Sequence, residues 1–133
     1  MNLIRVFEKN KAAAAFCVEK VRDPRKYGVI VGERVADNSY RVKKVMEKPS
    51  VPPSNIAIIA VYAFSPEIYR AIEEISPDAT NEIQLTDAIQ RLIDGNYPVY
   101  AVELSSAEKR IDIGTPQSYL SALGGMAKRA GSA

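Results

Sequence analysis

The sequence has 133 residues, of which 47% are hydrophobic and 26% charged, as in one ordinary globular domain. Its net charge of +2 is small and scattered, so we expect neither nucleic acid nor a membrane as a partner. The absence of histidine and the single cysteine exclude histidine general bases, zinc sites and an internal disulfide, and they favour a reducing cytoplasm. No signal-peptide pattern or membrane-spanning apolar run is present. Any catalysis must therefore use carboxylates, lysines, hydroxyls or a hard metal ion.

The first half of the chain is predicted to form one helix and four strands. Apolar residues at positions 3, 4 and 7 have helical spacing, and runs of apolar and β-branched residues bounded by turn formers indicate strands. In the first of these runs the alanines would equally suit a helix, whereas the last should be a strand buried on both faces. We expect a helix at Leu3–Glu8, strands at Ala13–Val21, Val29–Val35, Tyr40–Met46 and Ile56–Phe64, and a loop at Asp23–Gly28.

The second half is predicted to be mainly helical. Ser65-Pro66-Glu67 has a serine cap, a proline at the first helical position and an acid in the first turn, so a helix should start there and stop at Ser76-Pro77. A second helix is expected from near Asn81 to Gly95-Asn96, with Glu82 at its positive end. Its buried face should comprise Leu85, Ala88, Ile89, Leu92 and Ile93. We further expect strands at Val99–Leu104 and Ile111–Ile113, and a helix from Thr115-Pro116 to about Lys128.

This mixed order of strands and helices around one sheet indicates the α/β class. The stretch Glu47-Lys48-Pro49 stands out within it, because an acid and a base meet a proline that should end the strand. A glutamate can accept hydrogen bonds from two neighbouring sugar hydroxyls, and a lysine can balance a phosphate charge. Neighbours in a regular strand point to opposite faces, so both can serve one ligand only if the strand breaks between them. The alternative is a solvated acid–base pair.

Asp112 is a second candidate, because aspartate is depleted in strands and here lies between two isoleucines just before a predicted helix. A buried carboxylate needs a partner, which Mg²⁺ with nucleotide phosphates would supply. The alternative is an aspartate that caps the following turn. In the second helix, Glu82, Thr86 and Ile89 share one side. The polar residues on it either meet a ligand at the positive end of the helix, or only cap the helix and pack against the fold. Tyr62 is most simply a core aromatic whose hydroxyl needs one partner.

Together these motifs resemble those of the sugar-phosphate nucleotidyltransferases that make UDP-glucose or dTDP-glucose. The resemblance implies a Rossmann-like sheet and a reaction in which a sugar 1-phosphate attacks the α-phosphate of a nucleoside triphosphate and releases pyrophosphate. The matching pieces are, in order, Asp23-Pro24-x-x-Tyr27-Gly28-Val29, Glu47-Lys48-Pro49, Pro53-Ser54-Asn55, Tyr62, Glu82-Ile83-Gln84-Leu85-Thr86-Asp87-Ala88-Ile89 and Asp112-Ile113-Gly114-Thr115-Pro116.

The resemblance also implies roles for individual residues at a sugar-phosphate site. Gly28 would give a backbone contact to the sugar, Glu47 would bind sugar hydroxyls and Lys48 would contact the phosphate. Family members usually have a glycine two residues before the tyrosine that matches Tyr62, where this chain has Ala60. A methyl group at that position would crowd the sugar or merely shift it.

No G-x-G-T-R-like string occurs, although the family carries such a nucleotide loop, with the base-reading residues and a second metal aspartate, in a first half of similar length. The resemblance therefore implies that residues 1–133 form a single domain, the sugar-phosphate-binding C-terminal half, lacking the N-terminal nucleotide-binding strands. Beyond Asp112 as a Mg²⁺ ligand, no catalytic residue is expected in it. The missing strands would leave an edge of Ile56–Phe64 uncovered, so we expect a homo-oligomer or pairing with a missing N-terminal half.

The predicted activity is transfer of a nucleotidyl group, from UTP by preference, to glucose 1-phosphate, with this chain alone inactive. UTP is preferred because Glu82–Ile89 resembles the uridylyl branch, and because Thr80 stands where thymidylyl relatives often carry an arginine. Three alternatives stay open. The chain belongs to a thymidylyltransferase, is a non-catalytic sugar-phosphate-binding or assembly module, or is one half of a split enzyme.

Overall fold

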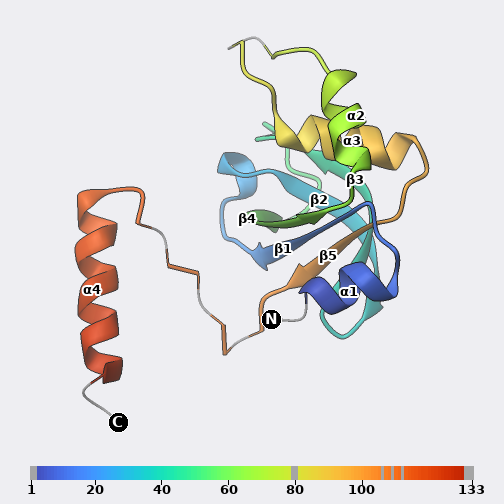
Figure 1. The fold of residues 1–133 in the computed structure, drawn as a ribbon. Coiled ribbons are helices and arrows are strands. Elements are labelled where there is room, and N and C mark those ends of the chain that lie inside the picture. The colour runs from blue at the N-terminus through green and yellow to red at the C-terminus, as the bar shows by residue number, and fades with distance from the viewer. Residues whose placement is uncertain (1–2, 79–80, 106, 109, 112, 131–133) are drawn as a thin grey trace.

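The structure is a computed structural model that describes residues 3–78, 81–105, 107–108, 110–111 and 113–130, the last six of these without their side chains. A five-stranded sheet carries helix α1 on one face and helices α2 and α3 on the other (Figure 1). The elements are α1 Leu3–Lys9, β1 Ala14–Lys20, a 3₁₀ helix Pro24–Lys26, β2 Val29–Ala36, β3 Ser39–Met46, β4 Ile56–Phe64, α2 Glu67–Glu73, α3 Leu85–Asp94, β5 Val99–Glu103 and α4 Pro116–Ala130.

Strand β1 lies at the centre of the fold. It pairs antiparallel with β4 and parallel with β5, so that Ala14 lies opposite Phe64 on one side and Val99 on the other. Its first five residues are fully buried. The alternating side chains serve two cores: Phe16 contributes to the core under α2 and α3, and Cys17 to the one under α1. Burial on both faces explains why this alanine-rich run is the predicted strand and not a helix.

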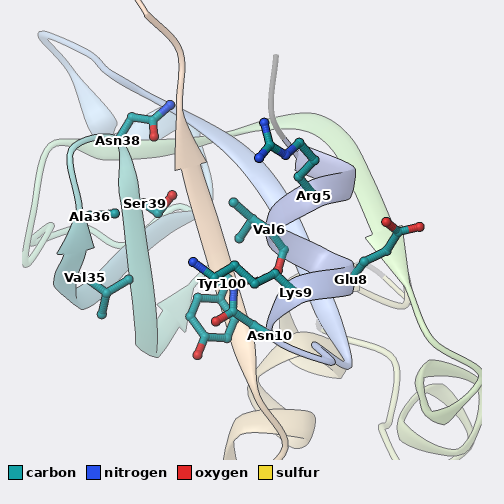
Figure 2. Close-up of a pocket in the computed structure, with 10 residues that line it drawn as sticks. All are labelled: Arg5, Val6, Glu8, Lys9, Asn10, Val35, Ala36, Asn38, Ser39 and Tyr100. Atoms are coloured by element: carbon teal, nitrogen blue, oxygen red, sulfur yellow. Dashed lines mark hydrogen bonds between the residues drawn. The ribbon is translucent and has the colours of Figure 1, made fainter.

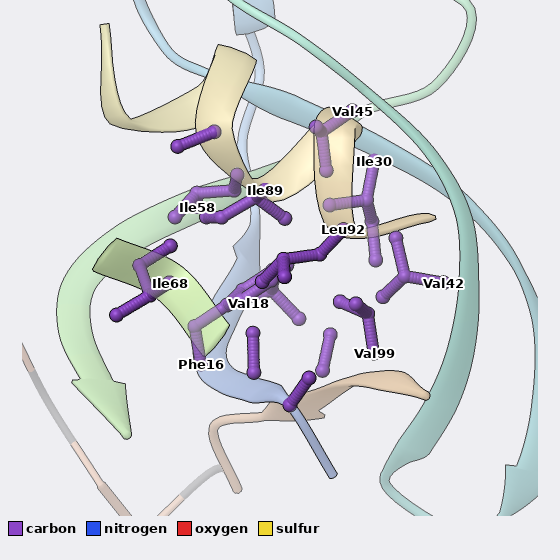
Figure 3. Close-up of a cluster of buried hydrophobic side chains, with 14 of the residues drawn as sticks. Phe16, Val18, Ile30, Val42, Val45, Ile58, Ile68, Ile89, Leu92 and Val99 are labelled. Carbon is purple, nitrogen blue, oxygen red and sulfur yellow. The ribbon is translucent and has the colours of Figure 1, made fainter. Parts of the chain in front are cut away.

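The larger core lies between the sheet and the helices α2 and α3, as Figure 3 shows. Aliphatic and aromatic side chains from all five strands meet the buried faces of the two helices there. Since each fully buried aliphatic or aromatic side chain contributes about 1.5–3 kcal/mol, this layer holds α3 firmly against the sheet. Its largest members include Phe16, Val18, Ile30, Val42, Val45, Ile58, Ile68, Ile89, Leu92 and Val99.

The sheet order is β1-β4-β2-β3-β5, and the sheet closes because β5 also pairs with β1. The predicted β2–β3 hairpin is confirmed, with Val29 opposite Met46, and β3 continues the sheet to β5 through Ser39 opposite Val102. The pairing between β2 and β4 is short. Among the described residues, Val29 and Ala57 are the only two that lie opposite each other in these strands.

Strand β4 has the predicted bounds, but the prediction that it is buried on both faces is wrong for its second half. Residues 57–59 are buried, whereas Ala60 and Val61 are exposed, Val61 by 40%. The pairing with β1 shifts here: Phe16 lies opposite Tyr62, while the next residue of β1 lies opposite Ile59. Two residues of β4 therefore bulge out of the ladder, and no described strand covers that edge beyond Ala57.

The predicted helix boundaries near residues 65 and 81 need correction. The Ser65 hydroxyl donates to the carbonyl of Ala13 (3.2 Å) and does not cap α2, which ends at Glu73, before Ser76-Pro77. Helix α3 starts at Leu85 and not near Asn81, whose φ of 62° is left-handed. Its predicted inner face is correct. Within α3, Ala88, Ile89 and Leu92 are buried, and Leu85 and Ile93 are half-buried against them.

Helix α4 starts as predicted. The Thr115 hydroxyl accepts a hydrogen bond from the Ser118 amide (3.1 Å), and the Ser118 hydroxyl accepts one from the Thr115 amide (3.0 Å). Figure 1 shows α4 standing apart from the sheet and the other helices. The predicted strand at residues 111–113 is not found in the described residues 111 and 113, and Asp112 itself lies outside the described residues. Among the helices described, none combines the length and apolar character needed to cross a membrane.

Candidate functional site

Glu47 and Lys48 follow β3 directly, so the strand ends where Pro49 predicted it would. Lys48 has a φ of 37°, in the left-handed region, which reverses the backbone and brings its Nζ to 3.6 Å from Glu47 Oε1. A non-glycine residue in this region costs of order 1–3 kcal/mol and persists only where its surroundings hold it. Here the Lys48 amide donates to the carbonyl of Tyr27 (3.1 Å). The break needed for both side chains to serve one ligand is present.

Thr86, in the first turn of α3, fixes the other side of the glutamate. Its hydroxyl donates to Glu47 Oε2 over 3.1 Å, and the residue is only 6% exposed. Helical spacing predicts Thr86 on the same side as Glu82 and Ile89, but it does not predict the bond to Glu47. The available signal was a polar residue beside the apolar positions 85, 88 and 89, since a buried hydroxyl needs a partner. The carboxylate is thus oriented by a hydroxyl on one oxygen and an ammonium near the other.

Gly28, just before β2, is buried behind this pair. A Cβ placed on it would lie 2.8 Å from Thr86 Cγ2, 3.1 Å from Glu47 Oε2 and 3.3 Å from Ile58 Cδ1. Its carbonyl accepts a hydrogen bond from the Ile58 amide (2.8 Å). The glycine is therefore required by close packing of the site's own side chains. A direct backbone contact between Gly28 and a sugar stays a prediction.

Tyr62 is half-buried, as expected of a core aromatic. Its ring stacks on Phe64 with centroids 5.5 Å apart and lies 6.0 Å from the ring of Phe16. Burial raises the pKa of the Tyr62 hydroxyl, and the negative charge of Glu47 raises this pKa further. The hydroxyl is thus within electrostatic reach of the carboxylate. Ala60 lies two residues earlier, exposed in the bulge of β4, so its methyl group is on the surface.

Other predicted residues are not brought to this site. Glu82 is exposed and precedes α3, because its amide donates to Asp78 Oδ1 (3.1 Å) while the Gln84 side chain donates to Asp78 Oδ2 (2.8 Å). Within the described part of the chain, no group of three histidine, cysteine or acidic side chains could hold a metal ion. Asp112 lies outside that part, so the Mg²⁺ site stays a prediction.

Comparison with known proteins places the chain in a family. The sequence model of the family described as nucleotidyl transferase matches residues 1–129. The chain belongs to the nucleotidyl transferase family. A UTP–glucose-1-phosphate uridylyltransferase of Pseudomonas aeruginosa is 39% identical over 103 residues, which are 75% of this chain and 36% of that protein. A low-salt glycan biosynthesis nucleotidyltransferase of Haloferax volcanii is 32% identical over 122 residues, or 92% of this chain and 32% of that protein.

Solved structures give the same result for this nucleotidyl transferase chain. An apo UDP-glucose pyrophosphorylase superposes with a TM-score of 0.87 at 30% identity, covering 96% of this chain and 46% of that one. A UDP-glucose pyrophosphorylase complexed with UDP-glucose superposes with a TM-score of 0.83 at 31% identity, covering 94% and 48%. The predicted fold class, a partial α/β nucleotidyltransferase fold with flanking helices, is confirmed. The chain spans less than half the length of each of these proteins.

Substituting Gly28 with alanine should destabilise the protein. The added methyl group meets the stiff Thr86 side chain and the Glu47 carboxylate, and overpacking of this kind typically costs about 1–3 kcal/mol. Urea unfolding measures the loss. Gly124→Ala in α4 is the matched control, because a Cβ there meets no atom within 4 Å, and it should not lower stability. A Gly28→Ala protein as stable as the parent would show that the site relaxes freely.

The raised pKa of Tyr62 predicts a pH dependence of stability. The folded protein holds the Tyr62 hydroxyl proton more tightly than the unfolded chain does. The contribution of this hydroxyl to the free energy of unfolding is therefore fully present below the ordinary tyrosine pKa of about 10, and it is lost as pH rises through the higher pKa of the folded state. In urea unfolding, Tyr62→Phe should lose less stability than the parent above about pH 10. Tyr69→Phe, at a ring 70% exposed, should follow the parent. Identical alkaline profiles for all three proteins would refute the assignment.

Proposed function

We propose that this chain is the sugar-phosphate-binding half of a nucleotidyltransferase that transfers a uridylyl group from UTP to glucose 1-phosphate. The observation that carries the proposal is the reversal at Lys48, which brings an oriented carboxylate and an exposed ammonium to one side. The Glu47 side chain is 26% exposed and that of Lys48 63% exposed, so a ligand can reach both. Relatives named as uridylyltransferases and as a thymidylyltransferase support the reaction class, while the preference for UTP rests on Glu82–Ile89.

In this proposal the described residues bind and position the sugar phosphate. Glu47 accepts hydrogen bonds from two adjacent sugar hydroxyls, and Lys48 neutralises the phosphate whose oxygen forms the new bond to the α-phosphorus as pyrophosphate leaves. Tyr62 and Ala60 border the sugar, and Gly28 approaches it through its backbone. Such a reaction depends mainly on in-line positioning and charge neutralisation, which suits a chain without histidine.

A metal ion and a nucleotide site complete the proposed enzyme. Mg²⁺, with Asp112 among its ligands, would neutralise the triphosphate. We expect the glycine-rich nucleotide loop in the N-terminal half, so this chain alone should release little or no pyrophosphate from UTP and glucose 1-phosphate. A cytoplasmic location, for which the single cysteine is the argument, belongs to the same proposal.

Calorimetry with glucose 1-phosphate and with glucose tests the two roles separately. Glu47→Gln should weaken binding of both ligands, whereas Lys48→Gln should weaken binding of glucose 1-phosphate alone. We expect each loss to be about tenfold, or 1.4 kcal/mol, for one charged contact. Thr86→Val should act like Glu47→Gln, because it releases the carboxylate.

The matched control for this experiment is a second exposed acid–base pair. Glu33 and Lys43 lie in the β2–β3 hairpin with Lys43 Nζ 3.5 Å from Glu33 Oε2, and their side chains are 72% and 55% exposed. Changing both to glutamine should leave binding unaltered. Binding by the Glu47 and Lys48 variants that equals that of the parent would refute the proposed roles and favour a purely structural module.

The open edge of β4 favours assembly with another chain, either a second copy or a separate N-terminal half. Beyond Ala57 no described strand pairs with this edge, and Val61 is exposed on it. Unpaired strand edges with apolar side chains invite pairing, and a lysine on the edge opposes it. Light scattering at micromolar concentration should therefore give a mass above that of the monomer, and Val61→Lys should lower it. Val51→Lys, at a loop residue 83% exposed, is the control. A stable monomeric parent would contradict the proposal.

A further inference from the structure

A polar cavity of about 580 Å³ lies between α1, the tip of the β2–β3 hairpin and β5 (Figure 2). None of the residues that line it belongs to the site around Glu47, and the proposed sugar-phosphate function gives them no role. The cavity has a charged side on α1, a polar floor at the hairpin tip and an apolar wall to which α1, β2 and β5 contribute. These three features together indicate a class of ligand.

The charged side includes Arg5 and Lys9, which lie one helical turn apart on α1, and Glu8 also lines the cavity. Figure 2 shows both side chains directed toward the hairpin, whereas the carboxylate of Glu8 points away from it. Neither Arg5 nor Lys9 makes an ion pair or a side-chain hydrogen bond with a described residue. By contrast, Lys20 and Arg34 both pair with the carboxylate of Glu103. Two positive charges at the same cavity, neither of them in an ion pair with a described residue, would be stabilised by an anion.

The polar floor includes Ser39, the first residue of β3. Ser39 is only 5% exposed, and its hydroxyl has no hydrogen-bond partner among the described residues. Every fully buried side-chain oxygen or nitrogen described in the structure does have a partner. The Ser39 hydroxyl is therefore not fully shielded from solvent, and Ser39 is one of the residues that line the cavity. A hydroxyl at the base of a cavity is a directed donor for an acceptor that enters it.

The apolar wall is formed by Val6, Val35 and the ring of Tyr100. Arg41 holds this ring in place: its Nη1 donates to the Tyr100 hydroxyl over 3.3 Å, and its guanidinium carbon lies 5.1 Å from the ring centroid. Arg41 thereby adds a third positive charge behind the wall. The wall offers an organic group a flat surface beside the two free cations.

We propose that this cavity binds a small phosphate monoester that carries a ring. The phosphate lies between Arg5, Lys9 and the Ser39 hydroxyl, and the ring packs against Tyr100. A phosphate monoester fits because its charge of about −1.5 to −2 and its three acceptor oxygens match two cations and one hydroxyl donor. Inorganic phosphate alone would leave the apolar wall uncovered.

Phenyl phosphate is the probe, titrated into the ¹⁵N-labelled chain and followed by amide chemical shifts. We expect saturable shifts at α1, at the hairpin tip and around Tyr100, with weaker binding of inorganic phosphate and no binding of phenol. The double variant Arg5→Gln/Lys9→Gln should bind phenyl phosphate at least about tenfold more weakly. Ser39→Ala should weaken it by a smaller factor.

Two further variants keep the experiment decisive. Lys43→Gln/Lys44→Gln removes the same net charge from exposed β3 residues that do not line the cavity, and it should bind like the parent. Glu47→Gln/Lys48→Gln should also bind like the parent, which separates this cavity from the proposed sugar-phosphate site. The absence of saturable shifts, shifts confined to the residues around Glu47, or an equal loss in the Lys43/Lys44 control would each overturn the proposal.

Discussion

The hydrogen bond between Thr86 and Glu47, packed over the bare backbone of Gly28, is the interaction on which the candidate site depends. It joins the residue after β3, the first turn of α3 and the entry to β2. Thr86 belongs to the helix face that the large core buries, so the orientation of the carboxylate follows from the packing of α3 on the sheet. A substitution in the core under α3 would therefore alter the candidate site without contacting it directly.

The strained backbone at Lys48 completes this arrangement. An extended residue there would send the two charged side chains to opposite faces, because neighbours in a strand alternate. The left-handed φ avoids this, and the bond from the Lys48 amide to Tyr27 ties the reversal to the segment that precedes Gly28. Local strain at a site is maintained where the surrounding structure holds it, and here the holding groups are backbone atoms. The Lys48 side chain takes no part in holding the reversal, and it is 63% exposed.

The sequence indicates most strands of this fold because their determinants are local: β-branched runs, the turn at residues 36–39 and the stop at Pro49. The features it missed depend on partners distant in the sequence. Thr86 meets Glu47 across 39 positions, and the bulge of β4 exists only against β1. The late start of α3 has a different cause, since the Asp78 carboxylate binds the Glu82 amide and the Gln84 side chain, and such side-chain bonds compete with a helical first turn.

The parallel pairing of β1 with β5 also sets an order for folding. Ala14 lies beside Val99, and α1 packs against β5 as well as β1, so the first strand acquires its second neighbour only when residues 99–103 arrive. Closing so long a loop costs conformational entropy before the strand pairing can stabilise the fold, and such sheets therefore form slowly. During synthesis at the ribosome, the β2–β3 hairpin can pair as soon as it emerges, whereas closure of the sheet must wait until β5 has left the exit tunnel.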